Sequence, residues 1–247
     1  MSKRTDSNLY TILFSIGMVV VVGGLLAFVA SSLRPIINAN KKIERQQNIL
    51  YAMGVNENDE SSVTFISKDK VQEAFSKYIK RQIVIEGDKI YDNDKAYLID
   101  IKKEQTAAKE GKTRKLPLFI GDKEGKTFFI APIRGKGLWD AIWGYVAMDE
   151  DMVVQGVYFD HAGETAGLGS NIKQRYFMDD FKGEKLMSKD NVFAGIKVAK
   201  GNNDPKNEDK TDNEVDAIAG ATITGDGVSA MIKTELKQYL PYFKTLK

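Results

Sequence analysis

The fold class is decided by one apolar stretch, Ser7-Asn-Leu-Tyr-Thr-Ile-Leu-Phe-Ser-Ile-Gly-Met-Val-Val-Val-Val-Gly-Gly-Leu-Leu-Ala-Phe-Val-Ala-Ser-Ser-Leu33, which contains no charged residue. As a helix, 27 residues extend about 40 Å, which is enough to cross a hydrocarbon core of about 30 Å. The stretch therefore predicts a membrane anchor. Two alternatives remain: a buried helix of a soluble protein, and a signal peptide cleaved near Ala30-Ser31-Ser32, although the apolar part of such a peptide usually has about 7–15 residues.

The composition of the whole chain of 247 residues excludes several classes of function. There is no cysteine, which rules out disulfides, thiolate metal sites and iron–sulfur clusters held by this chain alone. There is one histidine, so a zinc site would have to be built mostly from carboxylates, which argues against one. The net charge is only +2, which gives no footprint for nucleic acid. Redox chemistry would require an organic cofactor or a partner subunit.

The pattern after the anchor predicts an α+β fold. Arg34 and Pro35 are expected to end the span, and residues 36–52 and 70–78 to form helices. A final helix is predicted over 226–240, capped by Thr224 or Asp226. Residues 102–115 and 200–214 are polar and are expected to be a solvated excursion and a flexible loop. Alternation predicts six strands: Gln82–Glu86, Ala96–Ile101, Thr127–Ile133, Trp143–Met148, Val153–Phe159 and Val192–Val198.

This pattern divides the chain into an N-terminal segment with a transmembrane anchor, residues 1–35, and a domain of residues 36–247. The domain is expected to contain a mixed, mostly antiparallel sheet with flanking helices.

Three runs could carry chemistry. Ala219-Gly-Ala-Thr-Ile-Thr-Gly-Asp-Gly227 places two threonines among small residues at the start of the last predicted helix, where free amides can receive a phosphate. A plain helix cap is the competing interpretation, and a threonine hydroxyl needs an activating enzyme to form a covalent bond.

The second run is Asp160-His-Ala-Gly-Glu-Thr-Ala-Gly-Leu-Gly169, directly after a predicted strand. Its three glycines let the backbone approach a planar ligand, although a hairpin turn with a structural histidine has the same pattern. The third run is Arg134-Gly-Lys-Gly-Leu-Trp-Asp-Ala-Ile-Trp-Gly144, whose tryptophans indicate either an aromatic wall or an aromatic core cluster.

Together, and in this order behind one membrane span, these runs resemble the C subunit of the sodium-translocating NADH:quinone oxidoreductase. The family attaches FMN at an Asp, then Ser or Thr with Gly, then Ala-Thr; Asp216 and Gly220-Ala221-Thr222 match. The sequence departs at Ala219, where the family has Ser or Thr, and at Ala166, where it often has Pro.

The resemblance implies that a separate flavin transferase joins FMN to Thr222 as a phosphoester. It also implies that the protein relays electrons within a complex of six subunits that oxidises NADH, reduces quinone and pumps sodium ions outward. It implies no catalytic residue and no metal ligand in this chain. The flavin ring would lie against Glu164, Thr165, Gly167, Leu168 and Gly169. The phosphate would lie near Gly220, Ala221, Thr224 and the helix amides.

The resemblance further implies a single-pass protein of the bacterial inner membrane whose main domain is extracytoplasmic. Flanking charge alone favours the opposite orientation slightly, but long domains translocate largely regardless of charge. Two other functions stay open: the G subunit of the related Rnf electron-transport complex, and a membrane-tethered assembly module without redox chemistry.

Overall fold

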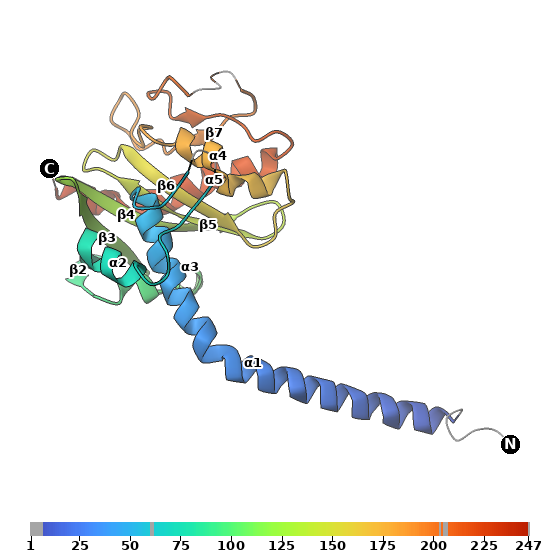
Figure 1. Cartoon of the computed structure of the whole chain (residues 1–247). Helices are drawn as coiled ribbons and strands as arrows, with labels where there is room; N and C mark the ends of the chain where they lie inside the picture. Colours follow the sequence, from blue (N-terminus) through green and yellow to red (C-terminus); the bar gives the residue numbers. More distant parts are fainter. Residues whose placement is uncertain (1–6, 60–61, 203, 205–206, 247) are drawn as a thin grey trace. The chain divides into compact units, whose positions relative to one another are not determined.

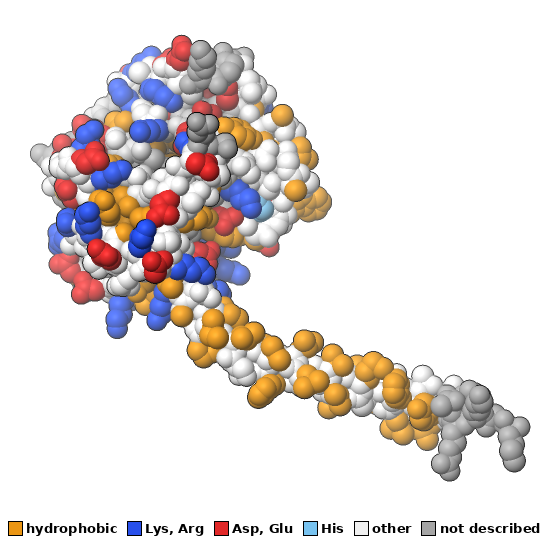
Figure 2. Space-filling model, viewed as in Figure 1, with side chains coloured by type: hydrophobic (Ala, Val, Ile, Leu, Met, Phe, Trp, Pro, Cys, Tyr) orange, Lys and Arg blue, Asp and Glu red, His pale blue; other side chains and the backbone are white. Residues whose placement is uncertain are grey.

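The computed structural model describes residues 7–59, 62–202, 204 and 207–246, and the chain separates into two compact units, Met1–Lys42 and Ile43–Lys247. One helix, α1 (Asn8–Ala52), contributes to both units (Figure 1). Within the described residues it is the one helix long and apolar enough to cross a membrane, and its most apolar window has a mean hydropathy of 2.7. Hydrophobic side chains cover the membrane-length part of α1, whereas charges of both signs mix over the second unit (Figure 2).

The sequence predicted that the membrane span ends at Arg34 and Pro35, followed by a separate helix; the helix itself runs through Pro35, which lies inside α1. The predicted helix over residues 36–52 is therefore the continuation of the same apolar helix. Proline removes one backbone hydrogen bond, but the flanking turns of a long helix keep their own. The end of α1 belongs to the second unit, where Ile49, Leu50 and Ala52 are fully buried.

The second unit is built on a six-stranded antiparallel sheet in the order β2-β1-β3-β4-β5-β6 (Figure 1). The sheet confirms the predicted fold class. A separate parallel pair, β7 (Lys197–Val198) and β8 (Glu214–Val215), makes the strands mixed, mostly antiparallel. The strands of the large sheet are β1 (Ile79–Glu86), β2 (Lys89–Asp92), β3 (Lys115–Lys123), β4 (Lys126–Lys136), β5 (Ala141–Met148) and β6 (Val154–His161).

Helices flank this sheet and connect its strands. The longest of them in the second unit, α5, starts at Thr222, four residues earlier than predicted. The α-helices are α2 (Val71–Tyr78), α3 (Ile101–Lys109), α4 (Arg175–Asp180), α5 (Thr222–Leu236) and α6 (Leu240–Lys244), with short 3-10 turns η2 (Ala96–Leu98), η3 (Gly169–Lys173) and η4 (Lys237–Tyr239).

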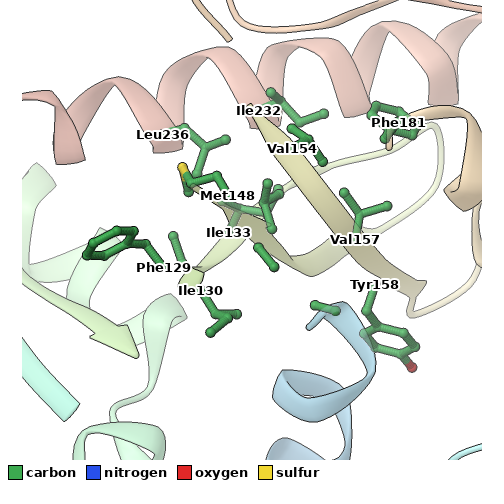
Figure 3. Packing of buried hydrophobic residues seen from close by; sticks show 14 of the residues in the cluster. Phe129, Ile130, Ile133, Met148, Val154, Val157, Tyr158, Phe181, Ile232 and Leu236 are labelled. Atoms are coloured by element: carbon green, nitrogen blue, oxygen red, sulfur yellow. The ribbon is translucent and has the colours of Figure 1, made fainter. Parts of the chain in front are cut away.

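The core lies on both faces of the sheet. On one face, Ile232 and Leu236 of α5 point toward the strands, and on the other the end of α1 packs beneath Tyr158 (Figure 3). The contacts are close: a Cβ added at Gly135 would lie 2.8 Å from Met231 of α5, and one at Gly156 would lie 2.5 Å from the Ala52 carbonyl oxygen. The first approach sets α5 against β4 and so helps to position the first turn of α5, and the second sets the end of α1 against β6.

Several sequence predictions of local structure were wrong. Residues 96–101 form a 3-10 turn and the start of α3 rather than a strand, and of residues 192–198 only Lys197–Val198 is a strand. The predicted excursion at 102–115 is largely α3, which buries no residue. In the predicted loop at 200–214, Asn207 is only 3% exposed, and residues 203, 205 and 206 lie outside the described residues.

Candidate functional site

The three runs singled out in the sequence meet at one cavity of about 250 Å³. They come from the turn between β4 and β5, the loop after β6, and the first turn of α5. The cavity contains all of the predicted site residues except Gly167, which lies nearby in the same loop at a φ of +75°. Its lining consists of Leu138, Glu164, Thr165, Leu168, Gly169, Gly220, Ala221, Thr222, Ile223 and Thr224.

Thr222 is the first residue of α5 and its side chain is exposed. The amides of the first turn of a helix have no intrahelical acceptor, and Ala221, the residue before α5, offers no side chain to cap them. They are therefore available to an anion. The prediction that Thr224 or Asp226 caps the helix is therefore wrong. Gly220 has a φ of +69°, a left-handed turn that starts the helix earlier than the sequence pattern suggested.

Thr224, only two residues further along, is in the opposite situation. It is 1% exposed, and its hydroxyl donates to Oε2 of Glu164 at 2.6 Å. Because a hydroxyl has one proton, Thr224 has none left to donate to a phosphate. Of the two threonines, only Thr222 presents a reachable oxygen.

Glu164 joins all three segments through its carboxylate. Oε1 accepts the backbone N–H of Trp139 at 3.0 Å, and Oε2 accepts the Thr224 hydroxyl. Burial raises the pKa of Glu164, but the hydrogen bonds from Thr224 and from the amides of Trp139, Asp140 and Leu138 outweigh it and hold the pKa below its ordinary value. The carboxylate is therefore ionised, and it faces the protein interior rather than the solvent.

Two glycines make room for this carboxylate. A Cβ at Gly137 would lie 2.5 Å from Oε1 of Glu164, and one at Gly169 would lie 2.6 Å from Oε2 and 2.5 Å from the Thr224 oxygen. Both glycines belong to runs that were singled out from the sequence. Glycine is needed there because a larger side chain would collide with Glu164. The inner side of the loop after β6 is filled by the Glu164 carboxylate, so a ligand could bind only on the side of this loop that faces the solvent.

The outer rim of the cavity is apolar. Leu138, Leu168 and Ile223 of the lining are exposed by 42%, 40% and 58% of their surface. The neighbouring Trp139, which does not line the cavity itself, is 67% exposed and extends this apolar rim. A Cβ at Gly220 would lie 2.9 Å from a methyl group of Leu168, so the rim is tightly assembled. A planar aromatic ligand would cover these side chains.

Trp139 is a site residue that was not assigned from the sequence, although its run was noted. Its indole N–H donates to Oγ1 of Thr165 at 3.1 Å, which ties the two loops together at the surface. The high exposure of Trp139 excludes the core-cluster interpretation for this residue. Trp143 lies half-buried in β5, opposite Arg134 and Asp160, and does not line the cavity.

His161 supports the same loop. Its Nδ1 accepts the backbone N–H of Glu164 at 3.1 Å, so the other ring nitrogen carries the proton of the neutral ring. This contact is structural. Among the described residues, no group of three or more His, Asp or Glu side chains is arranged to hold a metal ion.

Comparison with known proteins identifies the family. Residues 137–237 match the family described as FMN-binding domain, a range that contains every residue lining the cavity. The C subunit of the Na(+)-translocating NADH-quinone reductase from Haemophilus ducreyi is 30% identical over 225 residues, covering 85% of this chain and 82% of that protein. The C subunit from Neisseria meningitidis is 28% identical and covers 100% of this chain and 98% of its own.

Solved structures agree. The crystal structure of the C subunit from Parabacteroides distasonis matches with a TM-score of 0.71 and 29% identity, covering 85% of this chain and 96% of that one. The crystal structure of NqrC from Shewanella oneidensis matches with a TM-score of 0.65 and 25% identity, over 84% and 98%. The chain carries an FMN-binding domain and belongs to the NqrC family, the C subunits of the Na(+)-translocating NADH-quinone reductase.

Proposed function

We propose that this chain is a covalently flavinylated electron-transfer protein, with FMN attached through its phosphate to the hydroxyl of Thr222. The exposed Thr222 hydroxyl at the uncapped start of α5, beside a cavity with an apolar rim, carries the proposal. Attachment forms a bond between the Thr222 oxygen and the phosphorus of an activated flavin phosphate ester. The bond from phosphorus to the esterified leaving group breaks, and the Thr222 proton passes to a base of the transferase. No described base contacts this hydroxyl, so a separate flavin transferase must activate it.

The residues of the cavity fit this group. The free amides of the first turn of α5 and the positive end of its dipole stabilise a phosphate next to Thr222. A cavity of about 250 Å³ is too small for a whole flavin, so the ring would extend over the rim formed by Leu138, Trp139, Leu168 and Ile223. When bound, the flavin supplies the redox chemistry, and the chain positions it and limits its contact with water.

Ala219 bears on attachment rather than on the ring. It is exposed, so the missing hydroxyl at this position changes the surface offered to the transferase and not the packing of the cavity. We therefore infer that Ala219 affects the efficiency of attachment and leaves its position unchanged.

We further infer that the protein assembles with the other members of a sodium-pumping complex of six subunits, and that it relays electrons between their cofactors. The names of its relatives support a reductase of several subunits. An electron relay within a complex needs no substrate-binding cleft for NADH or quinone on this chain. It needs a flavin close to the surface, and the apolar rim provides that position.

Covalent attachment is tested by the intact mass of the chain and by fluorescence after denaturing gel electrophoresis. The parent and the Thr224→Ala variant are expected to retain a fluorescent band and the added mass of FMN, whereas Thr222→Ala is expected to lose both. A fluorescent band surviving in Thr222→Ala would place the acceptor elsewhere and contradict the proposal.

We propose that α1 spans the inner membrane once and that the FMN-binding domain is extracytoplasmic, where the family's transferase acts. Because the chain has no cysteine, a single cysteine reports its side of the membrane without interference. Cysteine in place of the exposed Thr211 is expected to react with a membrane-impermeant thiol reagent on intact cells. Reaction only after permeabilisation, with an outward-facing control labelled, would put the domain in the cytoplasm.

A further inference from the structure

A second and larger cavity, of about 700 Å³, lies between α3, the ends of β4 and β5, and α5. We call it the basic cleft. Thr222 does not line it, so it is distinct from the candidate flavin cavity, although Trp139 and Asp140 belong to the turn between the two. Its charged lining residues are Lys109, Arg114, Arg134, Lys136, Asp140 and Glu235.

The charges of the basic cleft are unbalanced. One of its two carboxylates is already neutralised, because Arg114 donates to both oxygens of Glu235, at 3.0 and 2.5 Å. This pair is largely removed from water, with side chains that are 10% and 6% exposed. Bidentate geometry makes it a fixed part of the wall rather than a free charge.

The three remaining cations have no such partner. Lys109, Arg134 and Lys136 form no ion pair within the part of the chain that the structure describes. Arg134 donates through one nitrogen to the neutral amide oxygen of Gln105, at 3.3 Å. Asp140 uses one of its oxygens to accept the amide of Ala141 at 2.6 Å. Three cations therefore face a single carboxylate.

The wall also offers neutral hydrogen-bonding groups. Gln105, Thr234 and Gln238 line the same space, and Gln105 is held in place because its amide nitrogen donates to the Arg134 carbonyl at 2.7 Å. Cavities of about 300–1,000 Å³ are typical of small-molecule sites. A guanidinium with uncommitted N–H groups is suited to the planar geometry of carboxylate and phosphate.

We propose that the basic cleft binds a small polyanion that carries phosphate or carboxylate groups, held by Arg134 and Lys136 on β4 with Lys109 of α3 on the opposite wall. None of these three cations lines the candidate flavin cavity. It lies on the other side of the turn that holds Trp139, so an occupant would contact the same turn that contributes the rim of the flavin cavity.

Isothermal titration calorimetry of the full-length chain in detergent tests the proposal, with pyrophosphate and citrate as separate probes. At least one probe is expected to show saturable binding. Tighter binding of pyrophosphate would indicate a phosphate ligand, and tighter binding of citrate would indicate a carboxylate ligand. The double variant Arg134→Gln/Lys136→Gln is expected to bind at least about tenfold more weakly, since two charge-assisted contacts are lost. Asp140→Asn removes the opposing carboxylate and is expected to tighten binding.

The matched control is Lys89→Gln/Lys95→Gln, which removes the same charge from exposed positions outside the basic cleft. It is expected to bind like the parent. The proposal is overturned if neither probe binds the parent, or if the control weakens binding as much as the cleft variant. Thr222→Ala is expected to bind with the parent's affinity; binding that appears only in this flavin-free variant would place the probe in the flavin cavity and also overturn the proposal.

Discussion

Two buried glutamates show how differently one fold can treat the same side chain. Glu164 beneath the flavin cavity is 7% exposed, and both of its oxygens accept hydrogen bonds. Glu184, in the segment between α4 and β7, is 0% exposed; one oxygen accepts from Asn207 at 3.0 Å, and the other has no partner among the described residues. The pKa of Glu164 is lowered, whereas burial raises the pKa of Glu184 to about 7.

The difference teaches that donors, not burial, decide the charge. Glu164 accepts hydrogen bonds from the Thr224 hydroxyl of α5 and from backbone amides of the turn between β4 and β5, so its charge is stabilised. Glu184 has one amide donor and the ammonium of Lys210 at 3.8 Å, which do not offset the loss of water. The carboxylate of Glu164 beneath the candidate site therefore stays charged, whereas that of Glu184 changes its charge near neutral pH.

The largest effect is expected from Glu164→Ala. This change leaves the Thr224 hydroxyl and the Trp139 amide without their acceptor, at a cost of about 3 kcal/mol in unfolding free energy. Chemical denaturation of the full-length chain measures it. Glu150→Ala, at an exposed carboxylate, is the matched control and should change little. A Glu164→Ala variant as stable as the parent would show that the three segments hold together without this carboxylate.

Next in size is the pH dependence that Glu184 confers. Its pKa of about 7 lies above the ordinary 4.5 of an exposed glutamate, so between these values the folded state binds more protons than the unfolded state. Stability contributed by this group is therefore greatest at low pH and is lost as pH rises from 4.5 through about 7.

Comparing the Tm of the parent and Glu184→Gln at pH 5.5 and pH 8 isolates this contribution. The parent is expected to lose more stability than the variant over this interval. An equal change in Tm between pH 5.5 and pH 8 for the parent and the variant would mean that Glu184 remains ionised in the folded protein. Glu184 and Glu164 would then not differ in charge.

Thr224→Ala should have a smaller effect of about 1–2 kcal/mol, because one hydrogen bond to a buried charge is lost. The same change should raise the pKa of Glu164, since its stabilising hydroxyl is gone. Thermal unfolding of Thr224→Ala and of Thr224→Ser, which keeps the hydroxyl, measures the bond. If serine is as destabilising as alanine, the methyl group and its packing matter more than the hydrogen bond.

The smallest change in stability is expected for Leu168→Ala, within about 0.5 kcal/mol, because this side chain is 40% exposed. Its effect should appear in the flavin instead: a shifted redox potential or slower turnover with the covalent cofactor retained. Thr165→Ala should behave alike, through the lost contact with the Trp139 indole. A redox titration identical to the parent's for both variants, with normal turnover, would remove this loop from the flavin site.

Much of the architecture could be predicted from local patterns, and the failures have physical causes. The long apolar N-terminal helix and most strands of the sheet follow from apolar runs and alternation. β3 escaped prediction because it contains Pro117 and Gly121, which usually argue against a strand inside a sheet. Contacts between residues far apart in sequence hold the strand in place, among them the hydrogen bond from the Tyr239 hydroxyl to the Pro117 carbonyl at 3.0 Å.

The candidate site was predictable as a set of segments and not as a set of contacts. The runs around Trp139, Glu164 and Thr222 were singled out from the sequence, and the fold brings them to one cavity. Sequence alone did not show that Glu164 turns inward, that Thr224 is its donor, or that Trp139 bonds to Thr165. These depend on the register of β4 against β5 and on the start of α5, which no local pattern specifies.

The fluorescence of the exposed Trp139 indole can report how close a bound flavin lies. Trp139 lies on the rim that would carry the flavin, whereas the other tryptophan, Trp143, lies half-buried in β5 outside that cavity. Light absorbed by an indole can pass to a nearby flavin without emission, and the transfer weakens steeply with separation. Attachment of the flavin would therefore quench the intrinsic tryptophan fluorescence of the protein, and movement of the ring away from the rim would restore it.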